Sequence, residues 1–156
     1  MKDIDLKVKQ LNTITARIIR NMSTTKYEMF FDGCSKGNPG AGGAGAVIYA
    51  DKEEISALCV YVGGHVTNNY SEYTGIKIGL ERAQELGIKS LTVYGDSLLV
   101  VKQMLGLYKV KSPNLLEIYE SCKTLSNAFE KIEFIHVYRD KNKRADALSN
   151  DGLLLA

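Results

Sequence analysis

The sequence predicts a single α/β domain in which helices pack on a mixed β-sheet. Three β-rich runs follow one another with only short turns between them, which is typical of antiparallel neighbours. After them, helical and strand patterns alternate, which favours strands joined by helices. The 156 residues, 45% of them hydrophobic and 24% charged, fit one ordinary globular domain with a sizeable core.

Five strands are predicted from short β-rich runs bounded by turn residues. They are Tyr27–Asp32, Ala44–Ala50, Ile55–Val62, Ser90–Gly95 and Ile132–Val137. The charged turn Asp51–Glu54 separates the second strand from the third.

Four helices are predicted in the same region from apolar spacing and from residues that begin or end helices. They cover Ser71 to about Leu86, Leu98–Leu105, Pro113 to about Phe129, and Lys143–Leu154. Ser71 is the predicted N-cap of the first of these helices, and Gly87 is its predicted end.

Residues 1–25 are set apart as an N-terminal extension, and residues 26–156 as the domain itself. Leu11, Ile14, Ile18 and Met22 recur at roughly helical spacing. We therefore expect either a short amphipathic helix over residues 5–22 or a poorly ordered tail. Five basic residues against two acidic ones give the extension a net charge of +3, so the remainder carries −1 of the total of +2. This distribution argues against a protein that coats DNA by overall positive charge.

The expected compartment is intracellular. No apolar run approaches the ~18–20 residues of a membrane span, and the first 25 residues lack the apolar block of a secretory signal. Cys34, Cys59 and Cys122 share no metal-like spacing and are expected to be reduced thiols. We expect a free-standing, monomeric, cytoplasmic protein without membrane contact, which would be nuclear or organellar in a eukaryote.

A glycine-rich stretch gives a formal G-x-G-x-x-G match at Gly40, Gly42 and Gly45, the dinucleotide-binding pattern. That pattern requires a helix directly after the glycines, whereas the β-type run A-V-I-Y-A follows here. Lys36 also lacks the K-S/T context of a phosphate-binding P-loop. The stretch is therefore predicted to be a hairpin connection, in which glycine lets the backbone approach a neighbour or ligand.

Four acidic residues stand where carboxylates often serve chemistry. Asp32 and Asp96 end predicted strands, and Glu72 and Asp146 lie near the starts of predicted helices. Each of them alone has an ordinary structural explanation, such as interaction with a helix dipole.

The segments that contain these acids form a pattern. D-G-C-S-K-G-N-P-G-x-G-G-x-G, T-N-N-x-x-E, V-x-G-D-S and N-K-R-A-D-A-L resemble, in this order, the signature segments of type 1 ribonuclease H. The resemblance covers about residues 26–152. It implies a ribonuclease H-like fold, with a five-stranded mixed sheet whose first three strands are antiparallel. It also implies an endonuclease that hydrolyses the RNA strand of RNA–DNA hybrids, leaving 5′-phosphate and 3′-hydroxyl ends.

By this resemblance, Asp32, Glu72, Asp96 and Asp146 are the catalytic, metal-binding carboxylates. The implied cofactor is a pair of Mg²⁺ ions, for which Mn²⁺ can substitute, since hard oxygen ligands suit these ions. Without metal the four carboxylates would repel one another, so we expect at least one raised pKa.

Substrate contacts are also implied by the resemblance, in part because short polar groups can read the ribose 2′-hydroxyl. They are Gly33, Cys34, Asn38, Asn68 and Asn69. The asparagines also have a bland explanation, since asparagine is common in turns. Candidate phosphate contacts are Lys36, Lys109, Lys111, Lys143 and Arg144.

The chain departs from the family pattern in three places. It has no Trp, and Y-K-V-K-S-P-N leads directly into one helix, so we expect a short form without the basic handle of many bacterial members. Hybrid binding is then expected to be weak unless residues 1–25 supply contacts. His136 falls in a predicted strand rather than in a flexible loop, and Arg139 resembles an arginine of members with a shortened loop; both are candidate auxiliary residues. Leu98 stands where a polar contact is common.

Two other functions are compatible with the sequence. A junction resolvase would use a similar acid cluster on different DNA, although the T-N-N segment and the glycine turn argue against it. A catalytically silent nucleic-acid-binding module would have no need of four mutually repelling carboxylates.

Overall fold

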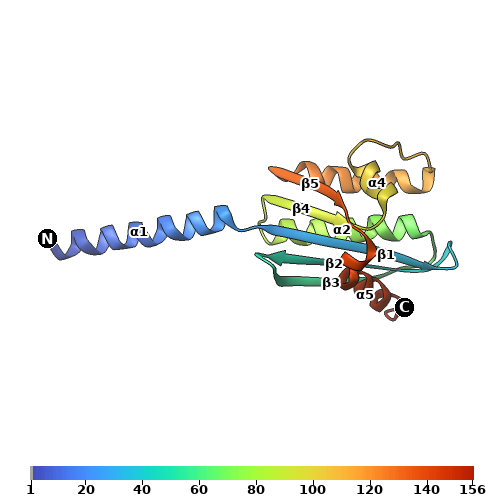
Figure 1. Ribbon diagram of the computed structural model, residues 1–156, viewed down its shortest axis with the longest axis horizontal. Coiled ribbons are helices and arrows are strands. Elements are labelled where there is room, and N and C mark those ends of the chain that lie inside the picture. The colour runs from blue at the N-terminus through green and yellow to red at the C-terminus, as the bar shows by residue number, and fades with distance from the viewer. Residues whose placement is uncertain (1) are drawn as a thin grey trace.

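The computed structural model describes residues 2–156, apart from the side chains of residues 20–23, so the prediction for the Met22 side chain lies outside the described part. Five strands form one sheet in the order β3-β2-β1-β4-β5 (Figure 1). They are β1 (Tyr27–Lys36), β2 (Gly40–Ala50), β3 (Glu53–Val66), β4 (Ser90–Gly95) and β5 (Lys131–His136). The first three strands pair antiparallel, whereas β4 runs parallel to β1 and β5 parallel to β4. The predicted fold class is confirmed.

Helices cover both faces of this sheet. They are α2 (Asn68–Glu85), α3 (Leu98–Met104), α4 (Pro113–Asn127) and α5 (Lys143–Leu153), with a 3-10 turn η1 (Arg139–Lys141) before α5. Helix α2 approaches the sheet at Ala46, and α5 approaches it at the neighbouring residue Gly45. Because successive strand residues face opposite sides, α2 and α5 lie on opposite faces. The main core lies under α2, where Phe31, Tyr73 and Val93 are fully buried.

The glycine-rich stretch lies inside the sheet. Strand β1 continues past Asp32 to Lys36, and β2 begins at Gly40, so the hairpin connection spans only residues 37–39. The prediction that Asp32 ends its strand and that the glycines form the connection was wrong. A Cβ atom on Gly43 would lie 2.1 Å from the Ser149 carbonyl oxygen, and one on Gly45 would lie 2.5 Å from Leu148 Cβ. The glycines therefore allow α5 to lie directly against β2.

The start of α2 also differs from the prediction. Its N-cap is Thr67, whose side chain accepts a hydrogen bond of 3.2 Å from the backbone N–H of Tyr70. Threonine is a good capping residue, and T-N-N supplies the cap before the apolar stripe begins. Ser71 therefore lies within the helix, fully buried. Gly87 follows the helix end with φ +74°, as its role as a helix terminator requires.

Two further features set this chain apart. Residues 105–112 link α3 to α4 with no further helix in that described segment, which confirms the short form without a handle. Helix α1 (Lys2–Thr24) projects away from the rest of the molecule, and β1 begins shortly after it (Figure 1). Among the described helices, none combines the length and the apolar character needed to span a membrane.

Candidate active site

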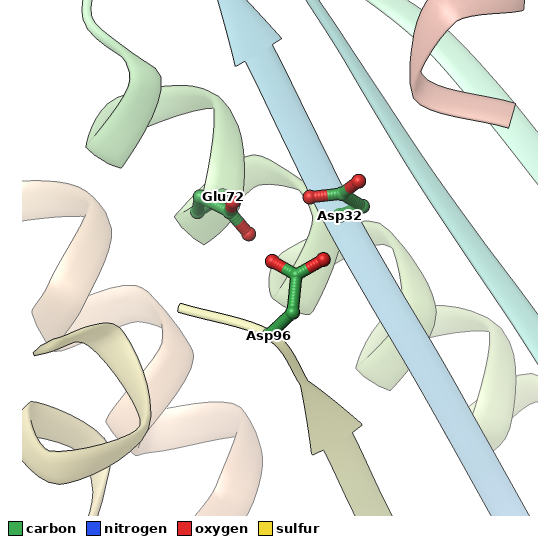
Figure 2. Close-up of side chains that lie close together, drawn as sticks. All are labelled: Asp32, Glu72 and Asp96. Atoms are coloured by element: carbon green, nitrogen blue, oxygen red, sulfur yellow. The ribbon is translucent and has the colours of Figure 1, made fainter. Parts of the chain in front are cut away.

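Three carboxylates from three different elements meet beside the middle of the sheet. Figure 2 shows the side chains of Asp32, Glu72 and Asp96 directed toward one another, from β1, from α2 and from the residue after β4. One carboxylate oxygen of each lies within 4.8 Å of the others. The parallel pairing of β1 with β4 explains why the two aspartates approach each other. Phe30 is aligned with Tyr94 in this pairing, and Asp32 and Asp96 each follow two residues later.

Close backbone packing sets the position of Glu72. A Cβ atom on Gly33 would lie 2.2 Å from the Glu72 backbone nitrogen. On the next turn of α2, a Cβ atom on Gly75 would lie 2.7 Å from the Asp32 carbonyl oxygen. Two glycines, one on each element, thus let β1 and α2 approach closely enough to bring the two carboxylates together.

The cluster is largely removed from solvent. Asp32 is 5% exposed and Glu72 is 7% exposed, while Asp96 is half-buried. The Gly33 backbone N–H donates a 2.9 Å hydrogen bond to Asp32 Oδ1. Glu72 Oε2, by contrast, is buried without a hydrogen-bond partner among the described residues. Such an unsatisfied carboxylate oxygen is costly unless a cation or proton accompanies it.

Burial and mutual repulsion shift the acidities of this cluster. Burial, followed by the charge of Asp96, raises the pKa of Asp32 to about 7. Burial, followed by the charge of Asp32, raises the pKa of Glu72 well above its ordinary value. A raised pKa was expected for clustered acids without metal, and Asp32 and Glu72 are the two residues whose pKa values are raised.

Asp146 stands at the rim of the same site. It lies in the first turn of α5, is exposed, and is not one of the three acids that approach within 4.8 Å. It nevertheless lines the same cleft and contributes to raising the pKa of Asp32. The structure therefore gathers all four predicted carboxylates, three at the centre and one at the edge.

The cleft also contains most of the predicted substrate contacts. Besides the four acids, its lining is Gly33, Cys34, Asn68, Asn69, Ser97 and Arg139. Asn38 is not part of this lining. Its side-chain Oδ1 accepts a 2.9 Å hydrogen bond from the Asn68 backbone N–H and so holds the β1–β2 connection against the start of α2.

The two candidate auxiliary residues occupy different places. His136 is the last residue of β5, so it is a strand residue, as its sequence position predicted. Its Nε2 lies 3.2 Å from the Asp96 backbone oxygen, and it is not part of the cleft lining. Arg139 begins η1 and lies at the cleft, exposed.

Two residues of the site were missed by the reasoning from sequence. Asn142 is 1% exposed and donates from Nδ2 to the Phe31 carbonyl oxygen at 2.9 Å and to Asp96 Oδ2 at 3.3 Å. Ser97 caps α3 by accepting from the Val100 backbone N–H at 3.3 Å, and it lines the cleft. The serine between a strand and a helical pattern was a readable capping signal. Asn142 is the first residue of the segment N-K-R-A-D-A-L, but its residue type and position did not indicate that it would contact Asp96.

The predicted phosphate contacts lie in three different settings. Arg144 is paired with Glu54, with 2.8 Å between Nε and Oε1, and is not part of the cleft lining. Lys109 and Lys111 line a second groove, which adjoins the carboxylate cleft because Asn69 lines both. Lys36 and Lys143 are exposed.

Comparison with known proteins gives a consistent set of relatives. Residues 30–152 match the reverse transcriptase-like family. The chain is 43% identical over 123 residues to the bifunctional protein Rv2228c of Mycobacterium tuberculosis. The aligned region covers 78% of this chain but only 34% of that protein. The solved N-terminal RNase H domain of Rv2228c superposes with a TM-score of 0.79 at 39% identity, covering 83% of this chain and 94% of that one.

Two further relatives are covered more completely. Ribonuclease HI of Halobacterium salinarum is 36% identical over 128 residues, 82% of this chain and 64% of that protein. The crystal structure of RNase H1 from the same archaeon has a TM-score of 0.79 at 34% identity, over 84% of this chain and 99% of that one. LC11-RNase H1, solved in complex with an RNA/DNA hybrid, has a TM-score of 0.77 at 36% identity, over 82% of this chain and 96% of that one.

Proposed function

The chain belongs to the reverse transcriptase-like family and, within it, to the type 1 ribonucleases H, and from this premise we propose that residues 26–156 hydrolyse the RNA strand of RNA–DNA hybrids. The observation that carries the proposal is the meeting of Asp32, Glu72 and Asp96 within 4.8 Å, with Asp146 at the rim. The hybrid complex of the similar LC11-RNase H1 supports the substrate. The proposed products have 5′-phosphate and 3′-hydroxyl ends.

The residues of the cluster fit divalent cations. Glu72 Oε2 is buried without a partner among the described residues, and the pKa values of Asp32 and Glu72 are raised. Both features are expected of carboxylates that are gathered to bind a cation. Oxygen ligands of this kind suit Mg²⁺, and Mn²⁺ as a substitute. Asp32, Glu72, Asp96 and Asp146 would hold two such ions, which when bound activate a water and stabilise the leaving oxygen of the cleaved phosphodiester.

Neighbouring groups keep these carboxylates in place. The Gly33 N–H fixes one oxygen of Asp32, and the Asn142 amide fixes one oxygen of Asp96. Each aspartate therefore has a defined orientation before any ligand arrives, which reduces the cost of organising the site during the reaction. Arg139 adds a cation at the rim, where it would face the phosphate of a bound strand.

The remaining lining provides for recognition of the substrate. Asn68, Asn69 and Ser97 present short polar groups to the cleft, of the kind that read a ribose 2′-hydroxyl. The adjoining groove with Lys109 and Lys111 offers two cations to phosphates farther along the strand. The cleft already contains the four acids and the polar lining residues, so the proposed reaction requires no residue from a second copy.

Cleavage of an end-labelled RNA strand tests this function. The strand is presented in an RNA–DNA hybrid, as single-stranded RNA and as duplex RNA, each with Mg²⁺, Mn²⁺ or EDTA. We expect cutting of the hybrid alone, dependent on either ion and lost in Asp32→Asn. A chain that binds the hybrid but cuts no RNA with either ion would be a silent binding module instead. Cutting of branched DNA in preference to the hybrid would indicate a junction resolvase.

A further inference from the structure

Helix α1 exposes an unusual amount of aliphatic surface. Each described side chain from residue 2 to residue 19 is exposed, and seven of them are large aliphatic groups with exposed fractions between 51% and 67%. They are Ile4, Leu6, Val8, Leu11, Ile14, Ile18 and Ile19. The helix projects from the domain, so the domain does not cover this surface (Figure 1).

Six of the seven aliphatic side chains fall on one side of α1. Ile4, Leu11 and Ile18 recur every seven residues, and Val8 and Thr15 stand four residues after the first two of them. The alternation of four and three residues is the spacing that keeps a seam facing a second helix in a coiled coil. Leu6 alone falls outside this stripe.

The side opposite the stripe is mainly polar. Lys2, Lys9, Thr13 and Arg17 lie there beside the exposed Leu6, so α1 has one aliphatic side and one side that is mostly hydrated. A helix that is rich in Ile, Thr and Asn has modest intrinsic stability, and most helices of such length depend on packing of their apolar face. The stripe therefore needs a cover that the chain's own domain does not provide.

We propose that α1 packs against α1 of a second copy of this chain, as a parallel two-stranded coiled coil that joins two catalytic domains. The spacing calls for a partner helix with the same seven-residue repeat, and α1 of a second copy supplies one. The flanks of the stripe agree with the parallel arrangement. Ile14 and Ile19 lie on opposite flanks, five residues apart, which is the separation of flanking residues that meet across a parallel pair.

The composition of α1 distinguishes a protein partner from a lipid surface. Helices that lie in a membrane interface usually carry Trp or Phe among their apolar residues. Residues 1–25 contain no aromatic residue, and Asp3 and Asp5 stand in the first turn of the helix. The apolar side consists mainly of β-branched residues in a heptad, which suits helix pairing.

The position of α1 gives the pair a consequence for substrate binding. Strand β1 begins at Tyr27, directly after the helix, so a parallel pair would hold two domains near the same end. Two linked domains bind a long hybrid with an effective local concentration that a single domain lacks. This tighter binding of hybrid rests on the proposed function, and it would compensate for the contacts that a basic handle provides in other members.

Mass measurement on the full chain tests the pairing. By light scattering and sedimentation over a range of concentrations, we expect twice the single-chain mass of 17.2 kDa. Leu11→Glu, in the stripe, should give the single-chain mass and a loss of helical circular dichroism. Gln10→Glu makes the same charge change at the adjacent position outside the stripe and should remain paired. A single-chain mass for the unmodified chain, an equal effect of both variants, or a larger assembly would overturn the proposal.

Disulfide trapping tests the orientation. Thr15 lies on the seam and Thr13 on the outer side, so Thr15→Cys should form a cross-linked dimer on mild oxidation and Thr13→Cys should not. The unmodified chain, with Cys34, Cys59 and Cys122, supplies the baseline. A mass of two chains without the Thr15→Cys cross-link would contradict the parallel register.

Hybrid and vesicle assays separate this proposal from its rivals and from the proposed function. Leu11→Glu should cleave a hybrid too short for two domains at an unchanged rate, but bind a long hybrid at least tenfold more weakly. A paired chain without cleavage would contradict the proposed function and leave the pairing intact. Two results would overturn the pairing. One is a single chain that binds phosphatidylserine vesicles through Leu11, and the other is a single chain that contacts the hybrid through the stripe.

Discussion

Asn142 Nδ2 lies 3.3 Å from Asp96 Oδ2 and donates a hydrogen bond to it. The same amide group donates to the Phe31 carbonyl oxygen, next to Asp32. The Asn142 backbone oxygen accepts from the Asp146 N–H at 3.0 Å. One buried asparagine thus contacts the segments that present three of the four acids, from a position immediately before α5.

Removal of this amide should impair the site more than the fold. Asn142→Ala removes the hydrogen bond to the buried Phe31 carbonyl oxygen, which costs about 1–3 kcal/mol of stability, and frees the Asp96 side chain to rotate. We expect kcat for hybrid cleavage to fall at least tenfold while KM changes little. Asn150→Ala, which removes an exposed bond to the Asp146 carbonyl oxygen, is the control. Steady-state kinetics with equal losses in both variants would refute a positioning role for Asn142.

The raised carboxylate pKa values predict an unusual pH dependence of stability without metal. Asp32 has a pKa of about 7 in the folded chain and an ordinary value of 3.8, so between these values the folded state binds more protons than the unfolded state. The free energy of unfolding must then fall as pH rises from about 4 to 7, by at most ~1.4 kcal/mol per pH unit for one group. Thermal unfolding in EDTA across this range measures the effect.

Two additions sharpen that experiment. Asp32→Asn keeps an oxygen for the Gly33 N–H but removes the charge, so the metal-free variant should be more stable than the unmodified chain at pH 8. Mg²⁺ or Mn²⁺ should raise the melting temperature of the unmodified chain at pH 8 more than that of the variant. A metal-free melting temperature that rises steadily from pH 5 to pH 8 would contradict the repulsion described for the cluster.

Gly33→Ala should disturb the approach of β1 to α2. Its Cβ atom would lie 2.2 Å from the Glu72 backbone nitrogen, so the strand or the helix must move. We expect a loss of roughly 1–3 kcal/mol in denaturant unfolding, with weaker Mn²⁺ binding by calorimetry. Gly64→Ala is a matched control, since its Cβ atom meets only the Tyr61 hydroxyl at 3.5 Å. Wild-type stability in Gly33→Ala would show that the close contact is not required.

Lys109 and Arg144 should differ in their effect on hybrid binding. Lys109 lines the groove beside the cleft, whereas Arg144 is occupied by Glu54. Lys109→Ala should weaken binding and reduce the slope of log affinity against log salt by about 1. Arg144→Ala should cost at most about 1 kcal/mol of stability and leave the slope unchanged. Titrations of labelled hybrid at several salt concentrations compare the two variants, and the reverse order would place the substrate on the other side of the molecule.

Local patterns predicted much of the fold because they reflect local physics. Ser90–Gly95 has the bounds that its β-rich run indicated, and Pro113 begins α4 as a residue suited to the first helical position. Where glycine dominates, the pattern was misleading. Gly40 and Gly42 have no side chains to mark a strand, so β2 begins earlier than its first β-branched residue suggests.

In the active site too, some residues could be predicted from local sequence patterns and others could not. Asp32 and Asp96 could be identified because they stand in the segments D-G-C-S-K-G and V-x-G-D-S, which carry the family resemblance. The hydrogen bonds of Asn38 to Asn68 and of Asn142 to Asp96 join residues 30 and 46 positions apart, respectively. Such contacts exist only once the sheet has formed, and residue types in one segment cannot specify them.

The glycines at the β2–α5 contact also shape how this protein can change by mutation. To a reader of the sequence, A-G-G-A-G-A resembles a permissive linker, yet Gly43 and Gly45 each face backbone or Cβ atoms of α5 at distances that exclude a methyl group. In a saturation library, these positions should therefore be depleted as strongly as the acids. The cause of the depletion would differ between the two kinds of variant. A glycine variant would lose soluble yield, whereas an Asp32 variant would accumulate as folded, inactive protein. Sorting the library by abundance before activity would separate the part of this stretch that builds the scaffold from the part that serves the reaction.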